Sequence, residues 1–255
     1  NAVDATQKRK ALLRVGEIEG NADGAQVHVI LDSEAKTLTI RDAGIGMTEE
    51  EVDKYINQIA FSGATEFVEK FQEKYADKAD AKEAIIGHFG LGFYSAFMVA
   101  DRVDIYSWSQ RKDAVPVKWT CDGSPNFEMG AIPEDDFKAL GRAEDQLHGT
   151  DIVLLLGEDG EEFNENARIT GILEKYCKFM PVPVVCGTKT EYVDDPEGAK
   201  DEEGNVKKVS IDVPFVVNKT EPAWTKKPAD LQDEDYAEFY RDLYPMNFED
   251  PLFHI

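Results

Sequence analysis

The chain has 255 residues, 42% of them hydrophobic and 10% aromatic, which is enough for one large or two ordinary domains with a real core. Its 51 acidic residues outnumber its 28 basic residues, and the net charge of −23 argues against a nucleic-acid-binding protein. The three cysteines form no CxxC pair and the four histidines show no ligand spacing, which indicates a reducing compartment without disulfides or structural zinc. No apolar run approaches the ~18 residues of a membrane span and no signal peptide is found, so we expect a cytoplasmic protein without membrane contact.

Residues 1–14 are expected to form a helix. Asn1, Asp4, Ala5 and Lys8 follow the i, i+3, i+4, i+7 spacing that places side chains on one helix face. No N-cap signal precedes Asn1, and the chain begins with Asn instead of Met. We therefore expect the helix to begin upstream and the chain to be a fragment or a processed product.

Two alternating strands are expected at 25–32 and 36–42, joined by a tight turn. Period two places Asp42 on the same face as the apolar Leu38 and Ile40, where a carboxylate must find hydrogen-bond donors or destabilise the fold. The sequence AGIGM that follows contains small residues, which leave room for a ligand to approach the backbone.

Residues 47–60 predict a helix with a well-marked start. Thr48 and Glu51 have the spacing of a capping box, and Met47 and Val52 have the spacing of a hydrophobic staple.

Residues 62–92 are charged and only weakly amphipathic, and glycines stand at both ends of this segment. Such a segment is typical of a mobile lid that closes over a ligand. It is equally typical of an ordinary pair of surface helices, so the residue pattern leaves both interpretations open.

Gly87, Gly90 and Gly92 form the pattern G-x-x-G-x-G, which is neither a dinucleotide-fold fingerprint nor a P-loop. A tight turn there, followed by a helix from Phe93, would direct free N–H groups and the positive helix end at a phosphate. A hinge or a helix C-cap turn is the alternative interpretation.

Further strands are expected at 102–109, 115–122 and 149–156, and a helix is expected at 166–180. Residues 191–203 carry seven acidic residues and one lysine, which indicates a linker or the tip of an exposed hairpin. The roughly 40 residues that follow are too few for a second core, so we expect a truncated or docked second domain.

The glycine-rich segment, Asp42 and the polar helix face form a set with a common chemistry. The Asp42 carboxylate cannot bind a phosphate, but it can accept a hydrogen bond from an exocyclic amine such as that of adenine. The neutral side-chain oxygen of Asn1 suits a magnesium ion that is already held by phosphates. The set therefore predicts adenine at one end and a magnesium–phosphate group at the other.

Six stretches of the chain together resemble the heat-shock protein 90 chaperone family, in its bacterial high-temperature-protein-G branch. They are NAVDA, IRDAGIGMTEEE, IAFSGATEF, IGHFGLGFYSAFMVAD, HGTDIVLLL and NKTEPAWTKKP. The resemblance covers nearly the whole chain in family order. The patterns D-x-G-x-G and G-x-x-G-x-G are shared with other Bergerat-fold ATPases such as gyrase B, mismatch-repair ATPases and histidine kinases, whereas FGLGFYSAFMVAD and PAWTKKP are more specific.

The resemblance implies an α+β fold, a two-layer sandwich of a mixed, mostly antiparallel sheet covered by helices, truncated at its N-terminus. It implies a nucleotide-binding domain at 1–190 with a lid at about 62–92, an acidic linker or hairpin region at 191–216, and the beginning of a middle domain at 217–255. The implied function is that of an ATP-dependent molecular chaperone, which binds ATP or ADP with Mg²⁺, acts on unfolded or partly folded client proteins and forms a homodimer at full length.

The resemblance also assigns roles to individual residues. Asn1 would hold the magnesium ion, and Asp42 would accept the adenine amine, with Thr150 supporting the base. Gly46 and Met47 would line the base, although Met47 can also be a staple residue and Thr150 a plain strand residue. The polar helix face and the glycine-rich segment would contact the phosphate side of the nucleotide, through Asp4, Lys8, Gly87, Gly90, Leu91, Gly92 and Phe93.

Two features depart from the family pattern. Phe61 stands where the family usually has a lysine, and an alanine is inserted in SGAT, which puts one charge contact with the nucleotide in doubt. The family's catalytic glutamate would lie one helical turn before Asn1, so this chain carries no catalytic residue of its own, and we expect it to bind nucleotide with little turnover. General-base assistance is typically worth ~10²–10⁴-fold in rate.

Two other functions remain as alternatives. One is a DNA topoisomerase or mismatch-repair ATPase of the same superfamily, against which the net charge of −23 speaks. The other is a non-enzymatic acidic interaction module, which would bind neither ATP nor ADP.

Overall fold

A computed structural model describes residues 1–58, 66–71, 86–87, 90–142, 147–194, 196, 208–247 and 249. The strands are β1 (Val27–Asp32), β2 (Thr37–Arg41), β3 (Ala100–Trp108), β4 (Val117–Cys121), β5 (Phe127–Ala131), β6 (Gly149–Leu156), β7 (Val184–Asp194) and β8 (Lys208–Val216). The α-helices are α1 (Ala2–Val15), α2 (Glu49–Ile56), α4 (Glu134–Leu140), α5 (Asn166–Tyr176) and α6 (Asp233–Leu243). Short 3-10 helices are η1 (Gly92–Met98), η3 (Glu158–Phe163), η4 (Ala223–Thr225) and η5 (Pro228–Asp230), and residues 66–71 are also helical.

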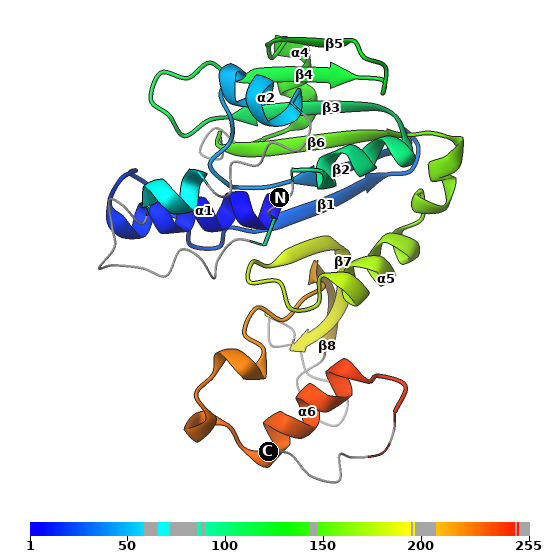
Figure 1. Ribbon diagram of the computed structural model, residues 1–255. Helices are drawn as coiled ribbons and strands as arrows, with labels where there is room; N and C mark the ends of the chain where they lie inside the picture. The colour runs from blue at the N-terminus through cyan, green and yellow to red at the C-terminus, as the bar shows by residue number, and fades with distance from the viewer. Residues whose placement is uncertain are drawn as a thin grey trace.

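The strands form one eight-stranded sheet in the order β5-β4-β3-β6-β2-β1-β7-β8 (Figure 1). β1 and β7 run parallel, and the other neighbouring strands of the sheet run antiparallel. The predicted α+β fold with a mixed, mostly antiparallel sheet covered by helices is therefore confirmed. In the described part of the chain, none of the helices combines the length and the apolar composition that crossing a membrane requires.

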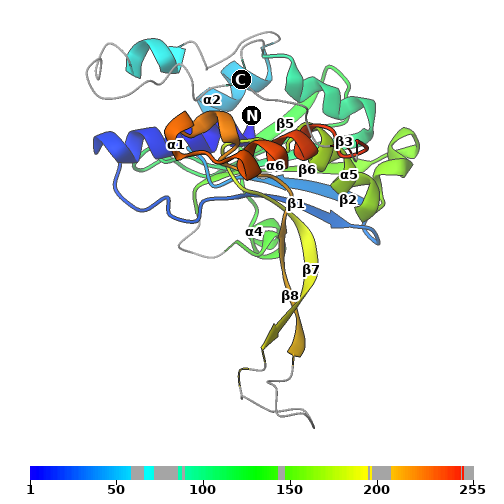
Figure 2. The same cartoon turned by 90° about the horizontal axis from the view of Figure 1, so that it is seen from below.

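Strand alternation builds the apolar face of the sheet. Val103 and Ile105 of β3 are 0% exposed, and Ile105 lies opposite Trp119 of β4 and Ile152 of β6. Apolar residues of α1, α2, η1 and α5 join these strand residues in one core cluster. Figure 2 shows α1 and α2 on one side of the sheet and α4 on the other. The molecule thus has one main core between the sheet and its helical layer.

The second face of the sheet is covered by α4 over its middle strands. The rings of Trp108 in β3 and Phe137 in α4 pack edge to face, with centroids 6.2 Å apart. The Tyr106 hydroxyl donates a hydrogen bond to Asp136 of α4 at 3.2 Å. Because Tyr106 and Trp108 alternate with Ile105 and Ser107, the residues on either side of β3 face different environments.

The helix that follows β2 begins as the sequence predicted. The Thr48 hydroxyl accepts the Glu51 N–H at 3.3 Å, and the Glu51 carboxylate accepts the Thr48 N–H at 3.0 Å, which confirms the capping box. α2 ends at Ile56, within the predicted range of 47–60, whose last two residues lie outside the described part.

The prediction for the segment after the glycines needs correction. The expected helix from Phe93 is a seven-residue 3-10 helix, η1, and β3 begins at Ala100 instead of Arg102. β5 and α4 were not predicted, because β5 lacks a clear apolar alternation and α4 has only seven residues. Of the predicted lid at 62–92, only residues 66–71, 86–87 and 90–92 are described, so its closure stays a prediction.

β7 and β8 form a long antiparallel hairpin that projects from the body of the molecule (Figure 2). Only the first residues of β7, Val184 to Cys186, pair with β1. The predicted boundary at residue 190 falls inside β7, and the tip of the hairpin at 197–207 lies outside the described residues. The division of the chain into domains therefore stays a prediction.

Candidate functional site

Asp42 lies directly after β2, and its residue is only 5% exposed. Its Oδ1 accepts the Gly44 N–H at 2.8 Å, and its own N–H donates to the Thr150 carbonyl oxygen at 2.9 Å. Burial raises the pKa of the Asp42 carboxyl to about 7, and the Gly44 N–H and the positive charge of Arg142 limit that rise.

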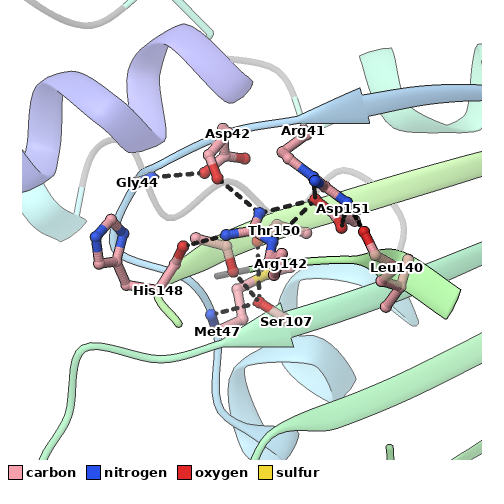
Figure 3. A network of polar contacts seen from close by, with 11 residues as sticks. Arg41, Asp42, Gly44, Met47, Ser107, Leu140, Arg142, His148, Thr150 and Asp151 are labelled. Atoms are coloured by element: carbon pink, nitrogen blue, oxygen red, sulfur yellow. Dashed lines mark hydrogen bonds and ion pairs between the residues drawn. The ribbon is translucent and has the colours of Figure 1, made fainter. Parts of the chain in front are cut away.

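A chain of hydroxyl groups connects two other predicted residues beside Asp42. The Oγ1 of Thr150 and the Oγ of Ser107 are 2.9 Å apart, and the Ser107 Oγ accepts the Met47 N–H at 2.8 Å (Figure 3). The structure therefore brings Asp42, Met47 and Thr150 together. Sequence analysis missed Ser107, although its alternation with Val103 and Ile105 places a hydroxyl on the buried face of β3.

Glycines keep the loop after Asp42 close to its neighbours. A Cβ on Gly44 would lie 2.5 Å from the carbonyl carbon of Ala5 in α1, and a Cβ on Gly46 would overlap the Trp108 carbonyl oxygen. Gly46 also has a φ of 60°, a backbone conformation that residues other than glycine rarely adopt. The Ile45 N–H donates to the Ala5 carbonyl oxygen at 3.2 Å, so this loop ties α1 to β2 and β3.

A second group of predicted residues meets at the start of α1. Asp4 is 6% exposed, and its two carboxylate oxygens accept the N–H groups of Ile86 and Gly87 at 2.9 and 2.8 Å. A Cβ placed on Gly87 would lie 3.0 Å from the Asp4 Oδ2 and 3.5 Å from the Asn1 Oδ1. Asn1, Asp4 and Gly87 are therefore neighbours, as the polar helix face and the glycine pattern predicted.

The remaining predicted residues lie around these two groups. The Lys8 ammonium is 5.4 Å from the centre of the Phe67 ring, and burial lowers its pKa while Asp4 and Glu51 oppose that shift. Gly90 has a φ of 65°, and Gly92 has open space where a Cβ would be. Leu91 is 50% exposed. The Phe93 ring packs 5.7 Å from the Trp119 ring in the core, so only its backbone remains for a ligand.

The site also has a charged layer that sequence analysis missed. Asp151 of β6 is 0% exposed and binds Arg41 and Arg142, through N–O distances of 2.8 and 2.7 Å. Arg142 also donates to the main-chain oxygen of Asp42 at 2.8 Å. The alternation of the expected strand at 149–156 could have revealed Asp151, but Arg142 lies in a loop with no periodic pattern.

The polar atoms around Asp42 and those around Asn1 and Asp4 fit an adenine nucleotide. Asp42 offers a buried acceptor oxygen to an amine, and the glycines leave backbone exposed to a close ligand. The oxygens of Asn1 and Asp4 are of the kind that Mg²⁺ prefers. Among the described residues, no group of three His, Cys, Asp or Glu side chains could hold a metal ion, so a Mg²⁺ ion here needs further oxygens from phosphate or water.

Comparison with known proteins agrees with this chemistry. A family model described as "Histidine kinase-, DNA gyrase B-, and HSP90-like ATPase" matches residues 1–150, and one described as "Hsp90 protein" matches residues 187–255. Over all of its 255 residues the chain is 51% identical to the chaperone protein HtpG of Porphyromonas gingivalis and 49% identical to that of Bacteroides fragilis, covering 33% of each. It is 36% identical to the chaperone protein HtpG of Idiomarina loihiensis, with 99% of the chain covering 37% of that relative.

The chain thus spans about a third of the length of the curated relatives it matches. The matches run from the first residue to the last, and the second family model favours the chaperone branch over gyrase B and the histidine kinases. The chain therefore belongs to the HSP90-like ATPase family, in the branch of the heat-shock protein 90 chaperones.

Proposed function

We propose that the chain binds ATP and ADP, with Mg²⁺, as the nucleotide-binding part of an ATP-dependent molecular chaperone. The observation that carries the proposal is the buried Asp42 carboxylate. Its Oδ1 accepts the Gly44 N–H, and burial raises the pKa of the carboxyl to about 7, so a further donor would stabilise its ionised form. A buried carboxylate is costly to ionise, and the exocyclic amine of adenine supplies a donor of the right kind.

The other residues have roles that follow from their positions. Ser107 and Thr150 hold the Met47 backbone beside Asp42, so that this part of the site is fixed before a ligand arrives. Asn1 and Asp4 present oxygens to a Mg²⁺ ion bound with the phosphates, and the backbone from Gly87 through Gly90, Leu91 and Gly92 to Phe93 contacts the phosphates. Lys8 adds a positive charge on the same helix face. When bound, Mg²⁺ would neutralise phosphate charge beside these carboxylate and amide oxygens.

The proposal extends to the whole protein, since this chain spans only about a third of the length of its relatives. The protein acts on unfolded or partly folded client proteins, works as a homodimer in the cytoplasm and binds neither nucleic acid nor membranes. The segment at 62–92 closes over the nucleotide as a lid. ATP hydrolysis belongs to the whole protein, whereas residues 1–255 alone bind nucleotide with slow turnover.

Titration calorimetry with Mg-ADP tests the proposal on the chain itself. We expect binding by the wild type and loss of binding in Asp42→Asn, because an amide is a poorer acceptor for the amine than a carboxylate. Asp104→Asn is the matched control, since Asp104 is equally buried at 6% but interacts with Arg102 and Thr120. A folded wild-type chain that binds no ADP, or an Asp42→Asn variant that binds as well as wild type, would overturn the proposal.

A further inference from the structure

Behind Asp42, on the opposite face of the sheet, lies a buried guanidinium group. The Arg142 side chain is 3% exposed, and its guanidinium carbon is 4.7 Å from the centre of the Trp108 ring. Tyr106 and Trp108 face α4, and Tyr106 lies opposite Asp151 in the sheet. Because side chains alternate along a strand, Arg142 and Asp151 occupy the α4 side, whereas Ser107 and Thr150 face the helical layer with the Asp42 carboxylate.

Arg142 contacts the candidate site at several points. Its Nη2 donates to the main-chain oxygen of Asp42 at 2.8 Å and to the Asp151 Oδ1 at 2.7 Å, and its Nη1 donates to the main-chain oxygen of His148 at 2.6 Å (Figure 3). The Asp42 N–H is held by the Thr150 carbonyl oxygen. Both backbone groups of Asp42 are therefore fixed, one by the neighbouring strand and one by Arg142.

We propose that Arg142 is a positioning residue for Asp42, which it holds by the main-chain oxygen from behind the sheet while its positive charge favours the ionised carboxylate. This inference rests on the proposed nucleotide site, where Asp42 must accept a hydrogen bond. A protonated carboxyl is a weaker acceptor than a carboxylate, and its O–H would face the adenine amine as a second donor. Arg142 thus acts on the ligand through Asp42 and without touching it.

A comparison with Arg41 distinguishes the positioning role of Arg142 from a purely structural role in the same cluster. Both arginines bind Asp151, and Arg41 does so through Nε and Nη2 at 2.9 and 2.8 Å. Arg41 also donates to the Leu140 carbonyl oxygen, at 2.6 Å, and not to Asp42. If the cluster served only to neutralise Asp151, the two arginines would be equivalent.

Among the described residues, two charged side chains act on the Asp42 carboxyl. Arg142 favours its ionised form, and Asp151 opposes it. On the α4 side His28 of β1 also faces Arg41, Arg142 and Asp151, and burial and the two arginines lower the pKa of its imidazole. On the helical side, Asp4 of α1 and Glu51 of α2 act on Lys8. A change at Arg142 should therefore be visible in the titration of Asp42.

The test measures the titration of Asp42 by carbon NMR of labelled aspartate side chains in the nucleotide-free chain, and the pH dependence of Mg-ADP affinity. In Arg142→Met we expect the midpoint of Asp42 to rise by about one pH unit or more, since an opposite charge within reach typically lowers an acid's pKa by ~1–3 units. The low-pH limb of the affinity profile should move by the same amount. Arg41→Met should leave both midpoints unchanged.

The two arginine variants distinguish a positioning role of Arg142 from a structural one. An unmoved Asp42 midpoint in folded Arg142→Met, or an equal shift in Arg41→Met, would overturn the inference. If Arg142→Met does not fold, Arg142→Lys against Arg41→Lys carries the test: we expect weaker ADP binding, by about tenfold, only in Arg142→Lys, because lysine lacks the planar fork. If the wild type binds no ADP, the proposed function fails, whereas the NMR midpoint still decides whether Arg142 controls Asp42.

Discussion

Asp4 and Gly87 are joined by a short hydrogen bond, in which the Asp4 Oδ2 accepts the Gly87 N–H at 2.8 Å. The second oxygen of the same carboxylate accepts the neighbouring Ile86 N–H at 2.9 Å. One buried carboxylate at the start of α1 therefore holds two consecutive backbone groups of the glycine-rich segment. These N–H groups are also the kind that phosphate oxygens bind.

Removing this carboxylate should loosen the segment. In Asp4→Ala we expect amide hydrogen exchange at Ile86 and Gly87 to become about tenfold faster or more, because hydrogen bonds to a charged acceptor contribute ~1.5–3 kcal/mol. Exchange measured residue by residue checks this, with Asp53→Ala on the exposed side of α2 as the control. Unchanged protection at these two amides would show that other contacts hold the segment.

The buried carboxylate of Asp42 should make stability fall with rising pH. Its pKa is about 7 in the folded chain against an ordinary value of 3.8, so between these values the folded chain binds more protons than the unfolded chain. The free energy of unfolding therefore decreases as the pH rises from about 4 to about 7, by an amount on the order of 4 kcal/mol, and is not affected by Asp42 above that range.

Urea unfolding at pH 5 and pH 8 measures this effect as a difference between two chains. The wild type should lose more stability over this interval than Asp42→Asn, whose amide does not titrate. Over the same interval the ADP affinity of the wild type should rise, since the ionised carboxylate is the stronger acceptor. Equal slopes in the two chains would mean that Asp42 is ionised throughout.

Local patterns predicted the parts of the site that one strand or one helix determines. Period two placed Asp42 on the buried face beside Leu38 and Ile40, and the spacing of Thr48 and Glu51 predicted a capping box. These features depend on residues within a few positions of each other, so the sequence contains them directly.

The missed parts depend on contacts between distant residues. Arg142 meets Asp42 across 100 positions, and Ser107 meets Met47 across 60. The loop position of Arg142 and the alternation around Ser107 do not predict which distant residue each polar side chain contacts. The apolar run after Gly92 predicted a helix but could not distinguish a 3-10 helix from an α-helix, because the two differ by one residue in hydrogen-bond spacing.

Gly46 should tolerate no side chain. Its φ is 60°, and a Cβ would overlap the Trp108 carbonyl oxygen, so Gly46→Ala should lower the free energy of unfolding by roughly 2 kcal/mol or more. Gly171→Ala is the matched control in α5, where a Cβ meets no atom within 4 Å, and it should stabilise the chain by about 0.5–1 kcal/mol. Urea unfolding of both variants checks this, and a Gly46→Ala chain as stable as wild type would refute the close approach.

The role of Asp42 as an acceptor for an adenine amine is tested most directly by comparing Mg-ADP with Mg-inosine diphosphate in titration calorimetry at pH 8. At the six-position of the base inosine has a carbonyl oxygen in place of the amine, and its neighbouring N1 carries a proton. We expect ADP to bind at least about tenfold more tightly, because the carbonyl oxygen would face the Asp42 carboxylate without a donor. Equal affinity for the two nucleotides would contradict the assignment of the base to Asp42.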